Sequence, residues 1–498
     1  MAAQPSAAAQ GQVDSWLTTA DQSHLLAPQS PLNLSTSAPQ DAHPISVDSS
    51  KRYQVMDGFG ASLTDSSAYV ISQLPASKRG ELMMKLFNVN TGAGLSYLRQ
   101  PMGASDFARS NYTYDDMPAG QTDPMLAHFS VAHDDAYILP LLRQALAINP
   151  SLKVMATPWS PPAWMRTGHS LIGASGGTLE PQYYDAYAQY FVKFVEAYAA
   201  AGVPVDAVTL QNEPEFAPEG YPGMLFSPAD QATFIIHLGP ALRAAGLSTK
   251  IMAFDHNWDL SSYAKTVLDN TDAAQYVAGT AFHCYGGDPS AQSDVHDVAP
   301  SKDVYLTECS GGDWSPDFGA NLNWGVGNLA IGAIRNWAKT VLLWNLALDT
   351  RGGPTNGGST NCRGVVTVDP SSGAVDYNVD YYVLGAFSKV VQPGAVRIDS
   401  STLESIGVQN VAFLNPDGSS ALVALNWGKT AQSVSVNADG QSFTTSIPVG
   451  SAASFRWTTQ EVTPTTTTSA STGRLSRRYP ATRPSLHAAS VRQRRADS

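Results

Sequence analysis

Short apolar runs alternate with amphipathic stretches through the middle of the chain, from Met56 to about Val391. One such stretch, residues 183–201, carries aromatic and aliphatic side chains at i, i+3 and i+4 spacing and ends at Gly202 and Pro204, which is typical of a helix. The apolar runs, about eight in all, have the length of buried strands: Met56–Phe59, Leu95–Arg99, Lys153–Thr157, Ala207–Leu210, Lys250–Phe254, Thr280–His283, Val304–Thr307 and Val341–Trp344. Strand and helix alternating eight times predict a (β/α)₈ TIM barrel, an α/β fold.

Both ends of the chain have a different pattern. After Val391 short β-type runs are separated by turn sequences such as Asn415-Pro416-Asp417-Gly418, which predicts a small antiparallel β-sandwich. Because chain termini often lie near each other, we expect the N-terminal strands to complete this sandwich. The predicted domains are therefore residues 1–52 (sandwich strands), 53–390 (barrel), 391–457 (sandwich) and 458–498 (a Thr/Pro-rich, then Arg-rich, disordered tail).

Composition narrows the classes of partner. Only 14% of the 498 residues are charged and 43% are hydrophobic, which indicates a folded protein. The net charge is −12, although the tail from Glu461 onward has an excess of arginine, so the folded part is acidic and nucleic acid is not an expected partner. The sequence has no apolar stretch long enough for a transmembrane segment. We expect a monomer.

Three cysteines, Cys284, Cys309 and Cys362, fit no zinc or redox spacing, and the sequence leaves open whether two of them pair. Residues 2–10 lack the basic and apolar regions of a signal peptide. Their small, Ala-rich composition suggests a mature start after signal removal, with Met1 as a cloning addition, so we expect a secreted protein.

Two glutamates follow apolar strand residues directly. Glu213 stands in the segment Gln211–Pro214 after the fourth run, and Glu308 follows the seventh run. Working residues of TIM barrels lie where the strands end, and Pro214 cannot continue a strand, so both carboxyl groups should meet at one mouth. Glycoside hydrolysis uses such a pair, with carboxyl groups about 5–5.5 Å apart in retaining enzymes. No metal, nucleotide or serine-hydrolase motif is present, and we expect no cofactor.

A series of motifs then resembles glycoside hydrolase family 30, which includes glucosylceramidases and microbial β-1,6-glucanases. The matching segments run in order along the chain: Asp57–Ala61, Thr64-Asp65, Arg99–Phe107, Thr157–Met165, Gln211–Pro214, His283–Tyr285, Thr307-Glu308 and Trp344–Leu348. The β region to Trp457 matches as well.

The resemblance implies roles for individual residues. Glu213 would be the general acid/base and Glu308 the nucleophile of a retaining mechanism. Arg99 would lie near the nucleophile and keep it ionised, and Asn212 would bind the sugar 2-hydroxyl. The remaining residues that the resemblance assigns to substrate binding are Asp106, Trp159, His283, Tyr285, Trp344 and Asn361. For His283 a purely structural polar role stays open, and Asp65 is expected to bond to backbone or cap a helix.

Family membership leaves the substrate open. The run from His283 to Gly287 and the run from Thr307 to Gly311 resemble the microbial β-1,6-glucanase branch, so we expect a β-1,6-glucan or another β-glucoside as substrate. Glucosylceramide, a small β-glucoside and xylan stay as alternatives within the family. A carbohydrate-binding protein without catalysis is the alternative from a different class.

Overall fold

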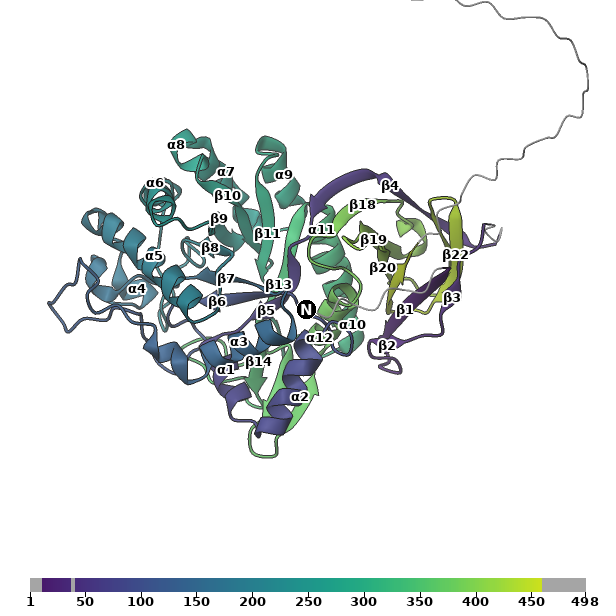
Figure 1. Cartoon of the computed structure of the whole chain (residues 1–498), viewed down its shortest axis with the longest axis horizontal. Helices are drawn as coiled ribbons and strands as arrows, with labels where there is room; N and C mark the ends of the chain where they lie inside the picture. Colours follow the sequence, from purple (N-terminus) through teal and green to yellow (C-terminus); the bar gives the residue numbers. More distant parts are fainter. Residues whose placement is uncertain (1–10, 37–40, 459–498) are drawn as a thin grey trace, which may run out of the picture. The chain divides into compact units, whose positions relative to one another are not determined.

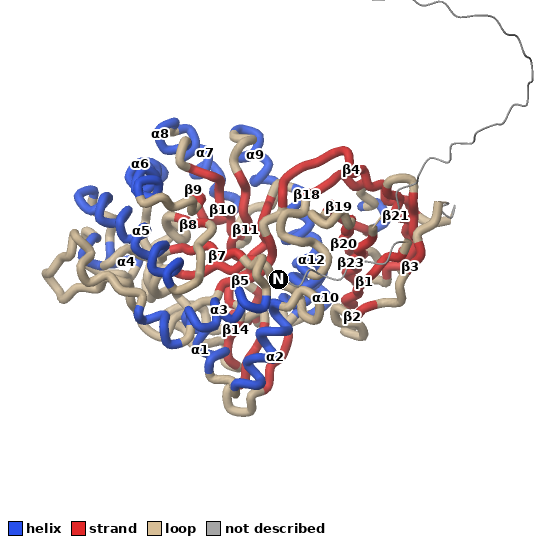
Figure 2. The backbone as a smooth tube through the Cα atoms, viewed as in Figure 1, coloured by secondary structure: helices blue, strands red, loops and turns tan. Residues whose placement is uncertain are grey.

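The computed structural model describes residues 11–36 and 41–458. Its central element is a closed barrel of parallel strands (Figures 1 and 2). In chain order these strands are β5 (Gly58–Ser62), β6 (Tyr97–Pro101), β7 (Lys153–Thr157), β8 (Ala207–Thr209), β9 (Lys250–Asn257), β10 (Val277–His283), β11 (Asp303–Glu308) and β13 (Ala338–Asn345). The predicted TIM barrel is confirmed, and Glu213 and Glu308 follow its fourth and seventh strands as expected.

Helices surround the barrel strands, as the blue segments of Figure 2 show. The longer ones are α1 (Asp65–Ser72), α2 (Ala76–Phe87), α3 (Ile138–Ile148), α5 (Tyr184–Ala200), α6 (Pro228–Ala244), α7 (Ser261–Asp269), α9 (Ser290–Val298), α10 (Phe318–Trp324) and α12 (Val379–Ser388). Short ones are α4 (Gly173–Gly176), α8 (Thr271–Ala274) and α11 (Ala333–Arg335). The predicted helix at residues 183–201 is α5, whose apolar face is buried. Thr64 caps α1 by accepting a hydrogen bond from the Ser67 N–H at 3.1 Å.

Buried side chains from several barrel strands, among them Tyr97, Met155 and Tyr305, form one apolar cluster. Close approach between strands explains a glycine of the Gly58-Phe59-Gly60 motif. A Cβ on Gly60 would lie 1.9 Å from the Tyr97 carbonyl oxygen, so no other residue fits there without moving β6. Small insertions at the mouth form the pair β12 (Gly311–Gly312) and β15 (Cys362–Arg363) and the three-stranded sheet of β14 (Ala347–Asp349), β16 (Val366–Asp369) and β17 (Ala374–Tyr377).

Both ends of the chain build the second sheet, as predicted. Its N-terminal strands are β1 (Gln12–Thr19), β2 (Ala27–Pro28), β3 (Leu32–Asn33) and β4 (His43–Val55). Its C-terminal strands are β18 (Val396–Ser400), β19 (Val408–Leu414), β20 (Ser420–Asn426), β21 (Gln432–Ala438), β22 (Gln441–Ile447) and β23 (Ser451–Trp457). Figure 1 shows the purple strands β1 and β4 among these green and yellow ones.

Strand β1 pairs antiparallel with β23 over its whole length, and β4 lies between β18 and β21. One difference from the expected antiparallel pattern is that β4 and β21 run parallel, although β4 is antiparallel to its other neighbour, β18. The sheet encloses its own apolar core, in which Val13 and Ile45 from the N-terminal strands pack with Phe455 and Trp457.

The sandwich is also joined to the barrel by hydrogen bonds. The Arg335 guanidinium donates to the Asn410 carbonyl at 2.7 Å, and the Ser454 hydroxyl donates to the Ala386 carbonyl at 2.6 Å. The disordered tail predicted for residues 458–498 lies, apart from residue 458, outside the described residues. None of the described helices is long and apolar enough to cross a membrane.

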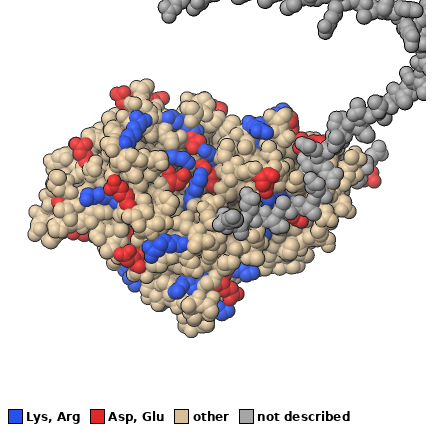
Figure 3. Space-filling view, in the orientation of Figure 1, with Lys and Arg blue, Asp and Glu red and all other residues tan. Residues whose placement is uncertain are grey.

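Charge on the described surface is sparse. On the face drawn in Figure 3, lysine, arginine and acidic side chains are interspersed, and most of the surface is uncharged. This distribution agrees with the low content of charged residues, 14% of the chain.

Candidate active site

The ends of the barrel strands form a cavity of about 260 Å³ at the mouth. Seven of the residues singled out from the sequence line it: Asp106, Trp159, Asn212, Glu213, Tyr285, Glu308 and Trp344. Tyr221, Ser310, Trp314, Ser359 and Cys362 complete the lining. The barrel therefore brings these residues, which are widely separated in the sequence, to one place.

The backbone at Glu213 has φ of +45°, in the left-handed region that non-glycine residues rarely adopt. Its N–H donates to the Asp255 carbonyl at 3.0 Å, and the neighbouring Asn212 N–H donates to the Pro158 carbonyl at 2.9 Å. These bonds hold the turn after β8 between its two neighbouring strands. The strained turn thus places Glu213 and Asn212 at the cavity.

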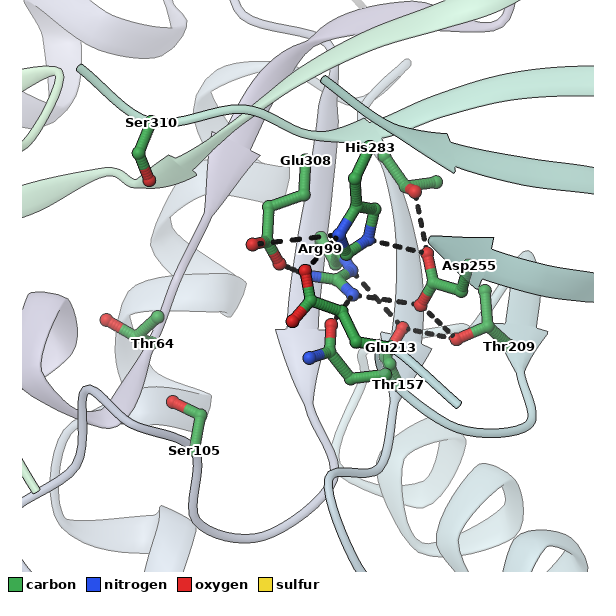
Figure 4. A network of polar contacts seen from close by, with 12 residues as sticks. Thr64, Arg99, Ser105, Thr157, Thr209, Glu213, Asp255, His283, Glu308 and Ser310 are labelled. Carbon is green, nitrogen blue, oxygen red and sulfur yellow. Dashed lines mark hydrogen bonds and ion pairs between the residues drawn. The ribbon is translucent and has the colours of Figure 1, made fainter. Parts of the chain in front are cut away.

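Arg99 lies beneath the cavity at the centre of a buried polar network, which Figure 4 shows. Its guanidinium contacts Glu308, and it donates to Asn212 Oδ1 at 2.8 Å and to Asp255 Oδ2 at 2.9 Å. It also lies 5.0 Å from the ring centre of Trp159. Arg99 thus connects the nucleophile candidate with the residue next to the acid/base candidate, while its own side chain is fully buried.

His283 is also fully buried, below the cavity lining. Its Nδ1 lies 3.1 Å from Glu213 Oε1, and its Nε2 lies 3.1 Å from Asp255 Oδ1. Burial lowers the pKa of His283, but the surrounding carboxylates Glu308, Asp255 and Glu213 outweigh burial and raise this pKa to about 9. The ring is therefore protonated at neutral pH and bridges two carboxylates, rather than facing the space where a sugar would lie.

Asp255, at the end of the fifth strand, was missed by the sequence analysis. Besides Arg99 and His283, it accepts hydrogen bonds from Thr209 and Thr307 at 2.7 Å each. Burial raises the pKa of Asp255, but Arg99 and His283 outweigh burial and hold this pKa well below its usual range. A carboxylate directly after the apolar run Lys250–Phe254 was the available signal, of the same kind as that used for Glu213 and Glu308.

The two glutamates face each other across this network (Figure 4). One oxygen of each, together with one His283 ring nitrogen, lie within 4.8 Å of one another. The Tyr285 hydroxyl donates to Glu308 Oε1 at 2.9 Å. Burial raises the pKa of Glu308 despite His283 and Arg99. For Glu213, burial is outweighed by the hydrogen bond and charge of His283, so its pKa is lowered.

These three ligand atoms are close enough for a cation in geometric terms. However, the Arg99 guanidinium contacts Glu308, and protonated His283 contacts Glu213, so the carboxylates already have cationic partners. The donor set thus favours proton chemistry over metal binding.

Two indoles form a wall of the cavity. The rings of Trp159 and Trp344 stack at 5.0 Å with an interplanar angle of 25°. Asp106 also lines the cavity. Burial, and then the charges of Glu308 and Glu213, raise the pKa of Asp106 well above its usual range. Indole rings cover the apolar face of a pyranose, and a carboxyl group bonds its hydroxyls, so this wall suits a sugar ring.

The structure places the other candidates as follows. Asn361 is exposed and does not line the cavity; its side chain contacts the Ser359 hydroxyl. Asp65 accepts hydrogen bonds from the Arg109 N–H at 2.8 Å and the Tyr137 hydroxyl at 2.7 Å, a bonding role of the expected kind. Cys284 and Cys309 form a disulfide between the ends of β10 and β11, and the free Cys362 is buried.

Comparisons with known proteins agree with this geometry. The sequence model described as the glycosyl hydrolase family 30 TIM-barrel domain matches residues 56–391, and that of the family's β-sandwich domain matches residues 394–455. The chain belongs to glycosyl hydrolase family 30. It is therefore an O-glycosyl hydrolase, as the paired glutamates predicted.

Several named relatives cover most of the chain. An endo-1,6-β-D-glucanase of Aspergillus fumigatus is 37% identical over 80% of this chain and 86% of its own length. The lysosomal acid glucosylceramidase of Mus musculus is 32% identical over 76% of each chain. The solved structure of the endo-β1,6-glucanase BT3312 superposes with a TM-score of 0.83 at 34% identity, covering 90% of this chain and 100% of that one.

Proposed function

We propose that this family 30 enzyme hydrolyses β-1,6-glucan with retention of anomeric configuration. The observation that carries the reaction class is the separation of the two glutamates, whose nearest oxygens lie within 4.8 Å. An inverting enzyme needs about 6.5–9.5 Å between its carboxyl groups to admit water between carboxylate and sugar, whereas about 5–5.5 Å suits direct attack.

In the first step Glu308 attacks the anomeric carbon while Glu213 gives a proton to the leaving oxygen. Tyr285 and Arg99 each contact a Glu308 oxygen and orient the carboxylate for attack. Asn212, which is fixed by Arg99, is the partner for the sugar 2-hydroxyl. That hydrogen bond strengthens toward the oxocarbenium-like transition state.

His283 supplies the electrostatic coupling between the two steps. It shares a proton with Glu213 across a 3.1 Å contact, so the pair holds the proton that the leaving oxygen receives. When Glu308 becomes an ester its charge disappears, and His283 loses an upward contribution to its pKa. Glu213 is then ionised and takes a proton from water in the second step.

The substrate assignment is supported by the named relatives. Endo-1,6-β-D-glucanases are 34–37% identical to this chain, whereas the Mus musculus glucosylceramidase is 32% identical. Hydrolysis rates on pustulan, glucosylceramide, xylan and aryl β-glucosides test the proposal. We expect pustulan to be the preferred polymer and the β-anomer to be the first product by proton NMR. Preference for glucosylceramide or xylan would overturn the substrate, and an α-anomer would overturn retention.

We also propose that the enzyme acts outside the cell as a monomer. The Cys284–Cys309 disulfide supports an oxidising compartment, where such bonds persist. One chain supplies every residue assigned to the reaction, so catalysis as proposed needs no second copy. Light scattering during gel filtration and thiol titration of protein recovered from culture medium test these two points.

A further inference from the structure

A second, larger cavity of about 460 Å³ lies beside the catalytic one. We call it the side cavity; its lining includes Ser310, Trp314, Asn321, Trp324, Leu329 and Arg363. Ser310 and Trp314 also line the catalytic cavity, so the two spaces share a wall. Ser310 follows the nucleophile candidate by two residues, and Figure 4 shows its hydroxyl on the segment that leaves Glu308.

The shared wall is an indole held in place by a glycine. The edge of the Trp314 ring lies against Gly312, where a Cβ would meet Cζ3 at 2.0 Å. Any other residue at position 312 would displace the ring. Although packed on this side, Trp314 is 55% exposed, so its outer surface is open to a ligand.

A second indole stands on the far side of the side cavity. Trp324, the last residue of α10, is 45% exposed. The chain continues from it into a π-helical segment, Gly325–Gly332, whose glycines allow close packing. A Cβ on Gly325 would lie 2.8 Å from Val383, and one on Gly327 would lie 2.9 Å from Leu425 of the sandwich. The wall that carries Trp324 is therefore fixed before any ligand arrives.

Polar contacts fix the loop between the two cavities. Asn321 donates to the Ser315 carbonyl at 2.7 Å, and Arg363 donates to the carbonyls of Gly312 and Ser315 at 3.3 Å each. Arg363 is itself held by Asp380 at 2.5 Å. The side cavity thus combines exposed indole surface with amide, guanidinium and hydroxyl groups on a fixed frame, which is the chemistry that recognises a pyranose.

We propose that the side cavity binds further glucosyl residues of the same glucan chain whose reacting residue occupies the catalytic cavity. Trp314 separates the two positions, and Trp324 is the outer aromatic platform. This inference rests on the proposed function, because it takes the polymer to be β-1,6-glucan. Its basis is that Ser310 and Trp314 belong to the linings of both cavities. Binding energy gained from residues that do not react should raise kcat/KM for longer substrates.

The test measures kcat/KM for Trp324→Ala and wild type on an aryl β-glucoside and on β-1,6-gluco-oligosaccharides of increasing length. In wild type kcat/KM should rise with length. The substitution should lower it roughly tenfold for the longest oligosaccharide and less than twofold for the aryl glucoside. Ala320→Trp, which crowds the side cavity from its exposed rim, should give the same selective loss. Thermal unfolding verifies that both variants fold.

Trp427→Ala is the matched control, because Trp427 is 49% exposed on the sandwich and lines neither cavity. Trp427→Ala should leave kcat/KM unchanged for every substrate. An unchanged length dependence in Trp324→Ala and Ala320→Trp would overturn the inference. Octyl β-glucoside serves as a further substrate. A loss of kcat/KM confined to it would also overturn the inference and make the side cavity an alkyl-chain site. If wild type itself rejects β-1,6-oligosaccharides but cleaves the aryl glucoside, the proposed substrate fails first, and this inference fails with it.

Discussion

A cluster of charged side chains lies at each end of the barrel, and the two clusters differ in their balance of charge. At the end where the strands begin, Asp57 lies 2.5 Å from Lys153, 3.4 Å from Lys339 and 3.8 Å from Lys250. The Tyr305 hydroxyl donates to it at 2.6 Å. Burial raises the pKa of Asp57, but these partners outweigh burial, so the pKa is lowered. This carboxylate is thus stabilised in its charged form. The lysines around Asp57 also contact Asp206 and Asp303, so that cluster holds three lysines and three carboxylates.

The mouth lacks this balance. Arg99 contacts Glu308 and Asp255 and lies near Glu213, which also shares the His283 proton. The pKa of Glu308 stays raised, because burial there outweighs the cations. Carboxyl groups outnumber the cations among these five residues. Their charged forms are therefore only partly compensated until a substrate develops positive charge between them.

The difference separates stability from chemistry. The cluster around Asp57, which we call the lower cluster, compensates the charge of that carboxylate and should contribute to stability. The mouth keeps its carboxyl groups in a state from which attack and proton transfer are favourable. Variants of the mouth should lose activity and keep the fold. Variants of the lower cluster should lower the free energy of unfolding and keep the activity.

The largest effect is expected from Glu308→Gln. The amide has the same shape but cannot form the glycosyl-enzyme, so kcat on an activated aryl β-glucoside should fall at least about 10⁴-fold. The thermal unfolding midpoint should change little, because a partly compensated buried charge is removed. Activity within tenfold of wild type would contradict the nucleophile assignment.

The second prediction separates the two glutamates by the products formed with azide. Glu213→Ala should lose about 10²–10⁴-fold on unactivated glycans and less on an activated aryl glucoside, which needs no proton donor. Azide should rescue its turnover and give a β-glycosyl azide, because azide attacks the glycosyl-enzyme without a base.

In Glu308→Ala, azide should occupy the face vacated by the nucleophile and give an α-glycosyl azide. Product configuration is read by NMR. If the two configurations were exchanged, the acid/base and the nucleophile would have to be reassigned.

The third prediction concerns the pH dependence that His283 provides. Since its pKa is raised to about 9, the proton shared with Glu213 should be lost only as the pH rises through that value. The basic limb of kcat/KM should therefore lie near pH 9 in wild type. In His283→Gln, Glu213 must hold the proton alone, so the limb should move to lower pH, with roughly tenfold loss at neutral pH.

His256→Gln is the control, because Nδ1 of His256 lies 3.9 Å from Glu213 and burial lowers the pKa of His256 to about 4. It should leave the basic limb in place. A basic limb that stayed near pH 9 in His283→Gln would reduce His283 to a structural residue.

The mouth and the lower cluster also differ in how far the sequence predicts them. Glu213 and Glu308 were predictable because each follows an apolar run directly, and strand ends of a barrel share one mouth. Asp255 follows a run in the same way, but its importance depends on partners from four other strands, which only the closed barrel brings together.

Other features depend on geometry that periodicity does not contain. The parallel pairing of β4 with β21 joins strands from opposite parts of the chain, which local patterns cannot place beside each other. The burial of His283 follows from its inward direction at the end of β10, which a one-residue shift of register would have reversed. Trp314 lies in a loop without a periodic pattern, and its position is determined by contact with Gly312.

The smallest effect on activity is expected at the lower end of the barrel. Asp57→Asn removes the buried carboxylate that three lysines share, while Lys250 keeps Asp206 and Lys339 keeps Asp303 as partners. The free energy of unfolding at pH 7 should fall by about 1–3 kcal/mol, a range that allows for these partners and for the partial exposure of the lysines. The activity at 25 °C should stay within twofold of wild type. Because the folded-state pKa of Asp57 lies below its unfolded value, its contribution is present above about pH 4 and is lost as the pH falls through the folded pKa.

Urea unfolding at pH 7 and pH 3 should therefore show a difference between wild type and Asp57→Asn that shrinks in acid. Asp399→Asn, whose partner Lys51 is 62% exposed, is the matched control and should lower the stability less than Asp57→Asn does. A large loss of activity in folded Asp57→Asn would mean that charge at the lower end reaches the mouth through Tyr305 and β11, and the separation of the two clusters would fail. An unchanged stability would instead show that Asp206, Asp303 and water compensate the three lysines without Asp57.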